Sequence, residues 1–305
     1  QEDSAQFMDL KPKLLQIIHS TMKLCKSIMK LLPKTAKIKS GKILVNGADI
    51  TDYTEKNMSR LRGELFSMVF QDPMTSLNPT ITVGKQIGEA VRIHNKKMSR
   101  GQIRKRVIEL MQLVEIDRPE ERIRQYPHEF SGGMRQRAVM AIALAGDPKI
   151  LFADEPTTAL DVTIQAQILD VFRRIQKKLE MATVFISHDL GVVAGVADRV
   201  AVMYAGKIVE IGTAEEIFYD PRHPYTWGLL QSLPVLSEGK EWLPTLPGMP
   251  PTLIHPPKGD AFAERNVYAM RIDYEKEPPM FRITDTHYAA TWLLDERAPK
   301  VKVPM

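Results

Sequence analysis

The hydrophobic residues of this chain fall into short runs that predict buried β-strands, and helical patterns separate these runs. The runs span residues 65–70, 150–153, 183–187 and 199–204. One of the intervening helical patterns spans residues 163–179. Because strands that alternate with helices form mostly parallel sheets with covered faces, the pattern predicts an α/β fold.

A long helical region interrupts this alternation. Residues 73–148 carry no strand pattern, residues 100–114 are periodic, and residues 134–145 are apolar on one face. The sequence therefore predicts a helical subdomain of about 73–148 inserted between strands.

The two ends of the chain have different patterns. Residues 14–32 mix apolar residues with lysine and predict one helix, either packed against the core or lying on a membrane surface; packing is favoured because the apolar residues are not confined to one face. After Asp220 the sequence becomes rich in proline, including residues 243–257, which excludes central strands and helix interiors there.

Composition narrows the function classes. The 305 residues contain no apolar run long enough to span a membrane, and the first residues do not resemble a secretory signal. Cys25 is the single cysteine, which excludes an intrachain disulfide framework and fits a cytoplasmic protein. The net charge of +5 would permit nucleic-acid binding, but acids and bases are interspersed, so no nucleic-acid partner is expected.

A small-residue helix start is the first candidate for chemistry. Ser131, Gly132 and Gly133 begin an apolar helix, and a hydroxyl with free amides at such a place can bind phosphate. Considered alone, these residues fit a flexible helix N-cap equally well.

Polar residues also follow three of the predicted strands. Asp154 and Glu155 end the run at 150–153, where one carboxylate can hold magnesium and its neighbour can activate a water molecule; a helix N-cap pair is the alternative. Gln71 and His188 follow two other strands, and the carboxyl ends of parallel strands are where α/β sheets place ligands. A lone histidine such as His188 is, however, more often structural.

Taken in this order, these elements resemble the ATP-binding-cassette (ABC) family. More narrowly, FQDPMTSLNP (residues 70–79), SGGMRQR (131–137) and DEPTTALDVTIQAQI (154–168) resemble the oligopeptide and dipeptide importer branch. The resemblance implies a P-loop-NTPase-like core with a mostly parallel sheet. It divides the chain into an unmatched segment at 1–25, a nucleotide-binding domain at 26–215 and a proline-rich, irregular C-terminal extension at 216–305.

The resemblance also implies roles for the residues that follow the strands. Gln71 would lie on the loop that contacts magnesium and the membrane subunit, and Asp154 would hold the magnesium ion. Glu155 would activate the attacking water, and His188 would sense the terminal phosphate of ATP.

Further roles concern the contact between two cassettes. Asp161 would lie on the loop that crosses the dimer interface. The signature that reaches the partner's ATP would consist of Ser131, Gly132, Gly133 and Gln136.

The sequence departs from the family at the phosphate loop, G-x-x-x-x-G-K-S/T, which cradles phosphates with backbone amides and a lysine. No such pattern occurs in the chain. Lys26 and Ser27 resemble the helix after that loop, which puts the loop at residues 15–22, where neither the lysine nor the glycines are present. This chain alone is therefore expected to bind ATP weakly and to hydrolyse it poorly.

A second departure concerns four cysteines that many relatives carry in the C-terminal extension as ligands of an iron–sulfur cluster. The matching positions here are Asp260, Asn266, Asp273 and Thr291. Because the ligands must be thiolates, no iron–sulfur cluster is expected.

The resemblance implies a peripheral ATPase on the cytoplasmic face of the membrane, which uses ATP and Mg²⁺ to energise import of oligopeptides or dipeptides. Its partners would be a second, distinct ABC ATPase in a head-to-tail heterodimer, transmembrane permease subunits and, indirectly, an extracellular peptide-binding protein. The alternative is a degenerate, non-catalytic cassette that acts as a scaffold beside an intact ATPase. DNA-repair and translation cassettes are disfavoured, because only one signature is present and the spacing leaves no room for a coiled-coil or zinc insertion.

Overall fold

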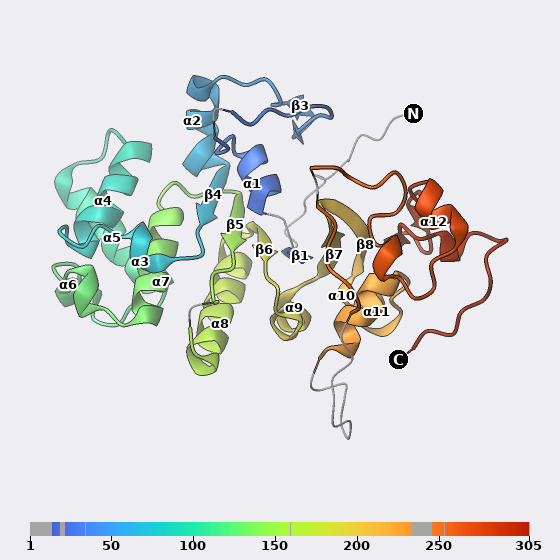
Figure 1. Cartoon of the computed structure of the whole chain (residues 1–305). Coiled ribbons are helices and arrows are strands. Elements are labelled where there is room, and N and C mark those ends of the chain that lie inside the picture. Colours follow the sequence, from blue (N-terminus) through green and yellow to red (C-terminus); the bar gives the residue numbers. More distant parts are fainter. Residues whose placement is uncertain are drawn as a thin grey trace. The chain divides into compact units, whose positions relative to one another are not determined.

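The computed structural model describes residues 14–18, 22–33, 35–158, 160–233, 246–252 and 254–304. Two compact units divide these residues (Figure 1). The first unit is drawn from Met22–Phe185, and the second combines Leu14–Thr21 with Ile186–Met305.

Three neighbouring strands form the core of the first unit. They are β4 (Phe66–Val69), β5 (Ile150–Asp154) and β6 (Ala182–Ile186), in that order. β4 and β5 run parallel, with Val69 opposite Ala153. Every residue of β5 and β6 is buried, as expected for strands covered on both faces. The connection between them is α8 (Val162–Leu179), close to the helix that the sequence predicts at 163–179.

The residues before β4 form smaller elements. They are α1 (Met22–Ile28), the two-stranded ribbon of β2 (Leu44–Val45) and β3 (Ala48–Asp49), and α2 (Glu55–Glu64). α2 is kinked near its end, where Arg62 and Gly63 leave the helical conformation. The ribbon turns at Asn46 and Gly47, which both have positive φ.

Helices alone occupy the region between β4 and β5, as the sequence predicts. They are α3 (Pro73–Ser76), α4 (Val83–His94), α5 (Arg100–Leu113), α6 (Pro119–Arg122), the 3₁₀ turn η1 (Pro127–Glu129) and α7 (Gly132–Ala143). Side-chain caps explain two of the starts: Ser99 and Gln102 form a capping box on α5, and Ser131 accepts a hydrogen bond from the Met134 amide at α7.

The sheet of the second unit is mixed. Its strands are β1 (Leu14–Ile18), β7 (Arg199–Tyr204), β8 (Lys207–Thr213), β10 (Tyr288–Ala289) and β9 (Phe281–Arg282), in that order. β1 and β7 are parallel, whereas the other neighbours are antiparallel. Ala205 and Gly206 both have positive φ (48° and 82°), the geometry of a tight two-residue hairpin turn between β7 and β8.

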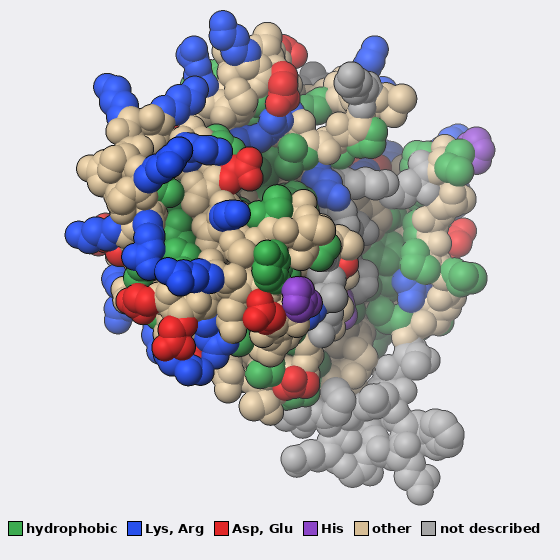
Figure 2. Space-filling view, turned by 90° about the vertical axis from the view of Figure 1, so that its left-hand side faces the viewer, with side chains coloured by type: hydrophobic (Ala, Val, Ile, Leu, Met, Phe, Trp, Pro, Cys, Tyr) green, Lys and Arg blue, Asp and Glu red, His purple; other side chains and the backbone are tan. Residues whose placement is uncertain are grey.

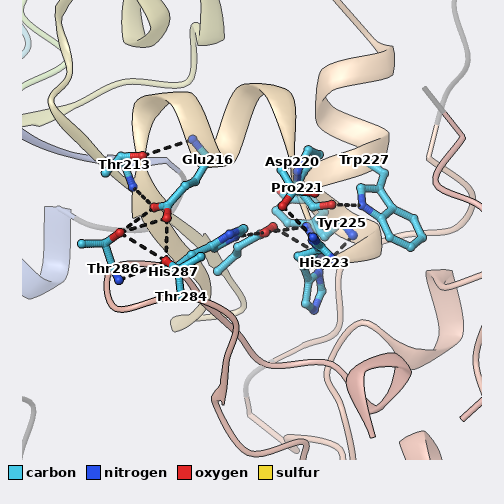
Figure 3. A network of polar contacts seen from close by, with 12 residues as sticks. Thr213, Glu216, Asp220, Pro221, His223, Tyr225, Trp227, Thr284, Thr286 and His287 are labelled. Atoms are coloured by element: carbon cyan, nitrogen blue, oxygen red, sulfur yellow. Dashed lines mark hydrogen bonds and ion pairs between the residues drawn. The ribbon is translucent and has the colours of Figure 1, made fainter. Parts of the chain in front are cut away.

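Short helices complete this unit. They are α9 (Leu190–Val196), α10 (Ala214–Tyr219), α11 (Pro224–Gln231), α12 (Arg271–Glu275) and the 3₁₀ turns η3 (Ala263–Arg265) and η4 (Trp292–Leu294). A core that includes Tyr204, Tyr225 and Phe262 joins α9, α10 and α11 to β7 and β8. A polar network between α10 and the 284–287 segment holds the C-terminal part in place (Figure 3).

One prediction from the sequence is wrong in part, and one strand was not predicted. The predicted helix at 14–32 is wrong in its first part, because Leu14–Ile18 is a strand paired with β7 and the helix is confined to Met22–Ile28. A short apolar run does not distinguish a helix from a strand, and the backbone of β7 decides it. β8 was not predicted, although it directly follows a turn with glycine.

In the described part of the chain, no helix has the length and hydrophobicity that a membrane span requires.

Candidate active site

The carboxyl ends of β4 and β5 bring two of the candidate residues together. Gln71 and Glu155 each lie two residues beyond the paired positions Val69 and Ala153. The Gln71 Nε2 donates a hydrogen bond of 2.8 Å to Glu155 Oε2. Parallel pairing of the two strands therefore produces this contact, which the sequence alone does not predict.

Glu155 lies on a strained turn. Its φ of 44° is in the left-handed region, which costs a non-glycine residue about 1–3 kcal/mol. Thr158 Oγ1 donates a second hydrogen bond, of 3.0 Å, to Glu155 Oε2. The side chain is thus oriented by two neighbours while it remains partly exposed to solvent.

Asp154 is the last residue of β5, and its side chain is buried with 3% exposure. Burial raises the pKa of this carboxyl, the negative charge of Glu155 raises it further, and the positive charge of Lys26 opposes both. A buried carboxylate with an acidic neighbour is stabilised by a cation, which is the property that a magnesium-holding acid requires.

The contribution of α1 to this site was not predicted from the sequence. Lys26 on α1 supplies the opposing positive charge at Asp154. Cys25 lies beside it, and burial together with the charge of Asp154 raises the pKa of its thiol to about 12. Such a thiol is unreactive at neutral pH. The signal was available, since Lys26 and Ser27 already matched the helix after the phosphate loop.

The signature residues and Asp161 also lie close together. Asp161 caps α8 by accepting a hydrogen bond of 2.9 Å from the Ile164 amide. A Cβ built on Gly133 would lie 2.7 Å from Ile164 Cγ2, so only glycine permits the starts of α7 and α8 to approach this closely. Ser131 and Gly132 remain exposed at this edge of the first unit.

Gln136 lies one turn into α7 and is fully buried. Among the described residues, neither its Nε2 nor its Oε1 has a hydrogen-bond partner. The amide is therefore an unsatisfied polar group in this structure, rather than a group exposed at the signature surface.

His188 belongs to the second unit. Its side chain is exposed, between Ser187, whose Oγ accepts a hydrogen bond from the Asp189 amide, and Asp189, which caps α9. This turn fixes the backbone at the end of β6 and leaves the imidazole at the surface.

The window of the phosphate loop, residues 15–22, overlaps the strand β1 and the start of α1. Residues 19–21 of this window lie outside the described residues.

The four positions that match cluster-binding cysteines are buried in the second unit. Each accepts a hydrogen bond from a nearby backbone N–H: Phe262 to Asp260 (2.9 Å), Tyr268 to Asn266 (3.0 Å), Met270 to Asp273 (2.6 Å) and Leu293 to Thr291 (3.3 Å). Burial, aided by the charges of Asp273 and Glu277, raises the pKa of Asp260 to about 6. These oxygen atoms are committed to turns and do not fit a cluster that thiolates must hold.

Two family models match the chain. One, described as ABC transporter, matches residues 23–158, and another, described as the oligopeptide/dipeptide transporter C-terminal region, matches residues 209–272. The first match begins after the window of the phosphate loop.

Curated relatives agree with both matches. The oligopeptide transport ATP-binding protein OppD of Bacillus subtilis is 61% identical over 91% of this chain and 78% of its own length. The dipeptide transport ATP-binding protein DppD of Lactococcus lactis is 58% identical over 90% and 79%. Both are named as ATP-binding proteins, and they give no support to the alternative of a non-catalytic scaffold.

Solved structures show the same fold. CbiO1 of Clostridium perfringens, described as part of the ABC transporter complex cbiONQ, superposes with a TM-score of 0.61 at 28% identity, over 69% of this chain and 80% of its own. The ATP-binding cassette MJ0796, described as a dimer bound to ADP and Pi, gives 0.57 at 22% identity, over 67% and 87%. The P-loop-NTPase-like α/β fold expected from the sequence is thereby confirmed.

Proposed function

Since this chain belongs to the ATP-binding subunits of oligopeptide and dipeptide ABC transporters, we propose that it couples ATP hydrolysis to the import of short peptides. The observation that carries the proposal is the hydrogen bond from Gln71 to Glu155 beside the buried Asp154. These three side chains have the chemistry of a hydrolytic nucleotide site at the carboxyl edge of the sheet.

Each side chain has a separate task in this proposal. Asp154 and Gln71 would hold Mg²⁺, which would neutralise phosphate charge when bound. The described residues contain no cluster of three or more His, Cys, Asp or Glu that could bind a metal, but magnesium in nucleotide sites needs only one or two carboxylates besides phosphate. Glu155, aimed by Gln71 and Thr158, would accept the proton of the attacking water.

The phosphate cradle is the weak part of this site. Without glycine amides and the loop lysine, little holds the β- and γ-phosphates, so we expect weak ATP binding by the chain alone. His188 would sense the terminal phosphate from its exposed turn.

A second, distinct ATPase subunit would complete the assembly. Ser131 and Gly132 are exposed beside the start of α8, and Asp161 lies at that start. In a head-to-tail pair these residues would face the nucleotide of the partner.

The permease subunit would dock on a groove of the first unit, about 780 Å³ in volume. Its lining includes Phe70, which is 41% exposed next to Gln71, and Ile93, which is 59% exposed on α4. An apolar segment of the membrane subunit would cover these side chains, and a push on Phe70 would reach Glu155 through Gln71. The chain would thus be peripheral, on the cytoplasmic face.

Peptide uptake by reconstituted transporters tests the proposal. Vesicles with permease subunits, partner ATPase and this chain should import a labelled peptide when given Mg-ATP. Ser131→Arg should lower uptake by about 100-fold, because the arginine obstructs the signature. Ser99→Arg is the matched control, since Ser99 also caps a helix but lies outside the signature, and it should retain most activity.

Two results would contradict the proposal. Uptake that persists without this chain would show that the transporter does not need it. Equal losses in the two serine variants would show that Ser131 acts only as a helix cap.

A further inference from the structure

The helical part of the first unit contains a second groove, of about 660 Å³, between α4, α5 and the residues after α6. Its floor is aliphatic and includes Ile103, Val107 and Ile123. Gly88 of α4 keeps the floor deep, because a Cβ there would lie 3.4 Å from Ile103 Cγ2 and 3.5 Å from Val107 Cγ2. None of the proposed nucleotide or permease contacts uses this groove.

Cationic side chains surround this floor. The lining contains one carboxylate, Glu89, and five cations: Lys85, Arg92, Arg100, Arg104 and Arg124. Within the described ranges of the chain, none of these five has an ion-pair partner within 4.0 Å. Figure 2 shows many Lys and Arg side chains on the face that carries α4–α6.

The starts of α4 and α5 add to this positive potential. Neither helix has an acidic residue in its first turn, whereas Lys85 and Arg100 lie there. Basic residues at this position are unfavourable for the helix dipole, so the groove gathers positive charge at the expense of helix stability. An anionic partner would relieve both effects.

Backbone amides do not form an anion nest in the groove. The amides of Val83 and Gly84 already donate to the carbonyl oxygens of Gln125 and Ile123, at 2.9 and 3.2 Å. Recognition would therefore rest on side chains. Lys85 and Arg92 are seven residues apart on α4, which is about 10 Å along the helix axis, too far for one phosphate group to contact both.

The floor distinguishes among extended anionic ligands. Among the described residues that line it, none carries an aromatic side chain on which nucleic-acid bases could stack. It is also concave, whereas a surface that inserts into a lipid bilayer presents protruding apolar side chains. An amphipathic peptide matches both features, because its carboxylates would meet the rim and its aliphatic side chains would occupy the floor.

We propose that this groove, between α4 and α5, binds an acidic amphipathic peptide segment of another protein. Its guanidinium groups pair with carboxylates of the segment, and the floor at Gly88, Ile103 and Val107 receives its aliphatic anchors.

Fluorescence anisotropy with the full chain tests this proposal. The probe is a labelled peptide of about twelve residues, with leucine at i, i+3 and i+7 and glutamate elsewhere. The double variant Arg100→Glu, Arg104→Glu should weaken binding about tenfold or more. Lys177→Glu, Lys178→Glu on α8 changes the net charge equally outside the groove and should change binding less than about twofold.

A pair of glycine variants tests the floor. Gly88→Ala fills part of the floor without a severe clash and should weaken binding about threefold. Gly101→Ala on α5 makes the same change where nothing lies within 4 Å, and it should leave binding unchanged. Unfolding temperatures of all variants establish that each is folded.

Three results would overturn the proposal. These are an acidic peptide that does not bind saturably, a loss in the α8 variant equal to that in the α5 variant, and a preference for phosphatidylglycerol vesicles or oligothymidylate with the same sensitivity to Arg100 and Arg104. The last result would assign the groove to a lipid surface or to nucleic acid instead.

Discussion

Glu155 in the first unit and Glu210 in the second are held in opposite ways. Glu155 is partly exposed on a left-handed turn, where Gln71 and Thr158 orient it. Glu210 is fully buried on β8, where it accepts hydrogen bonds from two successive backbone amides and from a histidine ring. The structure thus leaves one carboxylate partly exposed to solvent and uses the other to hold the fold together.

The commitment of Glu210 explains how the C-terminal part is attached. The amides of Arg222 (2.5 Å) and His223 (3.1 Å) connect β8 to α11, and His287 Nε2 (2.8 Å) connects it to the 284–287 segment. Figure 3 shows His287 and His223 on either side of this network. Because a proline-rich segment forms few regular backbone hydrogen bonds, these bonds to Glu210 help to hold it in place.

The largest expected effect is on Glu210. Glu210→Ala would leave two backbone amides and the buried His287 ring without their acceptor, which should lower the free energy of unfolding by about 3–5 kcal/mol. Urea unfolding measures this loss. Glu155→Ala should change stability by less than about 1 kcal/mol, so equal losses at the two glutamates would remove the contrast between them.

For catalysis, in contrast to stability, Glu155 should be the more important of the two glutamates. In a version of the chain with an intact phosphate loop, Glu155→Gln should slow ATP hydrolysis by about 10²–10⁴-fold, because the base that accepts the proton of water is lost. Steady-state phosphate release by the assembled transporter measures this effect. Hydrolysis that is unaffected by this change would exclude Glu155 as the base.

Acid should destabilise the second unit through Glu216. Although burial opposes ionisation, hydrogen bonds from Thr284, Thr213 and Thr286 lower the pKa of its carboxyl from 4.5 to about 2. Since the folded pKa is the lower one, this stability is present above pH 4.5 and is lost as the pH falls from about 4.5 to about 2.

Threonine variants test this window. Thr286→Val removes a hydroxyl donor and should move the acid midpoint of unfolding upward by about half a pH unit. Thr80→Val removes an exposed hydroxyl that donates to Asn78 and should leave the midpoint in place. An equal shift of the acid midpoint in both variants would show that the acid response does not depend on Glu216.

The smallest effect concerns the unsatisfied amide in the first unit. Gln136→Leu replaces an unpaired polar group by an apolar one of similar size and should raise the free energy of unfolding by about 1 kcal/mol. Thermal unfolding measures the gain. Gln136→Glu should lower stability instead, and a loss in both variants would mean that the amide is satisfied in solution.

Much of the sheet could be predicted from local patterns. The expected strand at 199–204 and the expected helix at 163–179 agree with β7 and α8. Buried strands and capped amphipathic helices can be recognised from their own hydrophobic patterns. β1 could not be told from a helix, since five apolar and amide residues fit either, and only pairing with β7 decides.

The site was predictable in its parts but not in its contacts. The sequence placed three candidates, Gln71, Asp154 and Glu155, at the ends of predicted strands. The parallel register of β4 and β5 then brings Gln71 and Glu155 within hydrogen-bond distance. The influence of Lys26 on Asp154 depends on where α1 packs, and the burial of Gln136 depends on which face of α7 meets the core. Neither is a property of spacing along the sequence.

Calorimetric titration with Mg-ATP tests our proposal that the carboxyl edge of the sheet is a nucleotide site without its phosphate cradle. The titration compares the full chain with a version in which residues 1–25 are replaced by a strand and an intact phosphate loop. Only the second version should bind ATP with micromolar affinity, about −8 kcal/mol. Equal affinity of the two versions would refute the proposal, because another segment would then have to hold the phosphates.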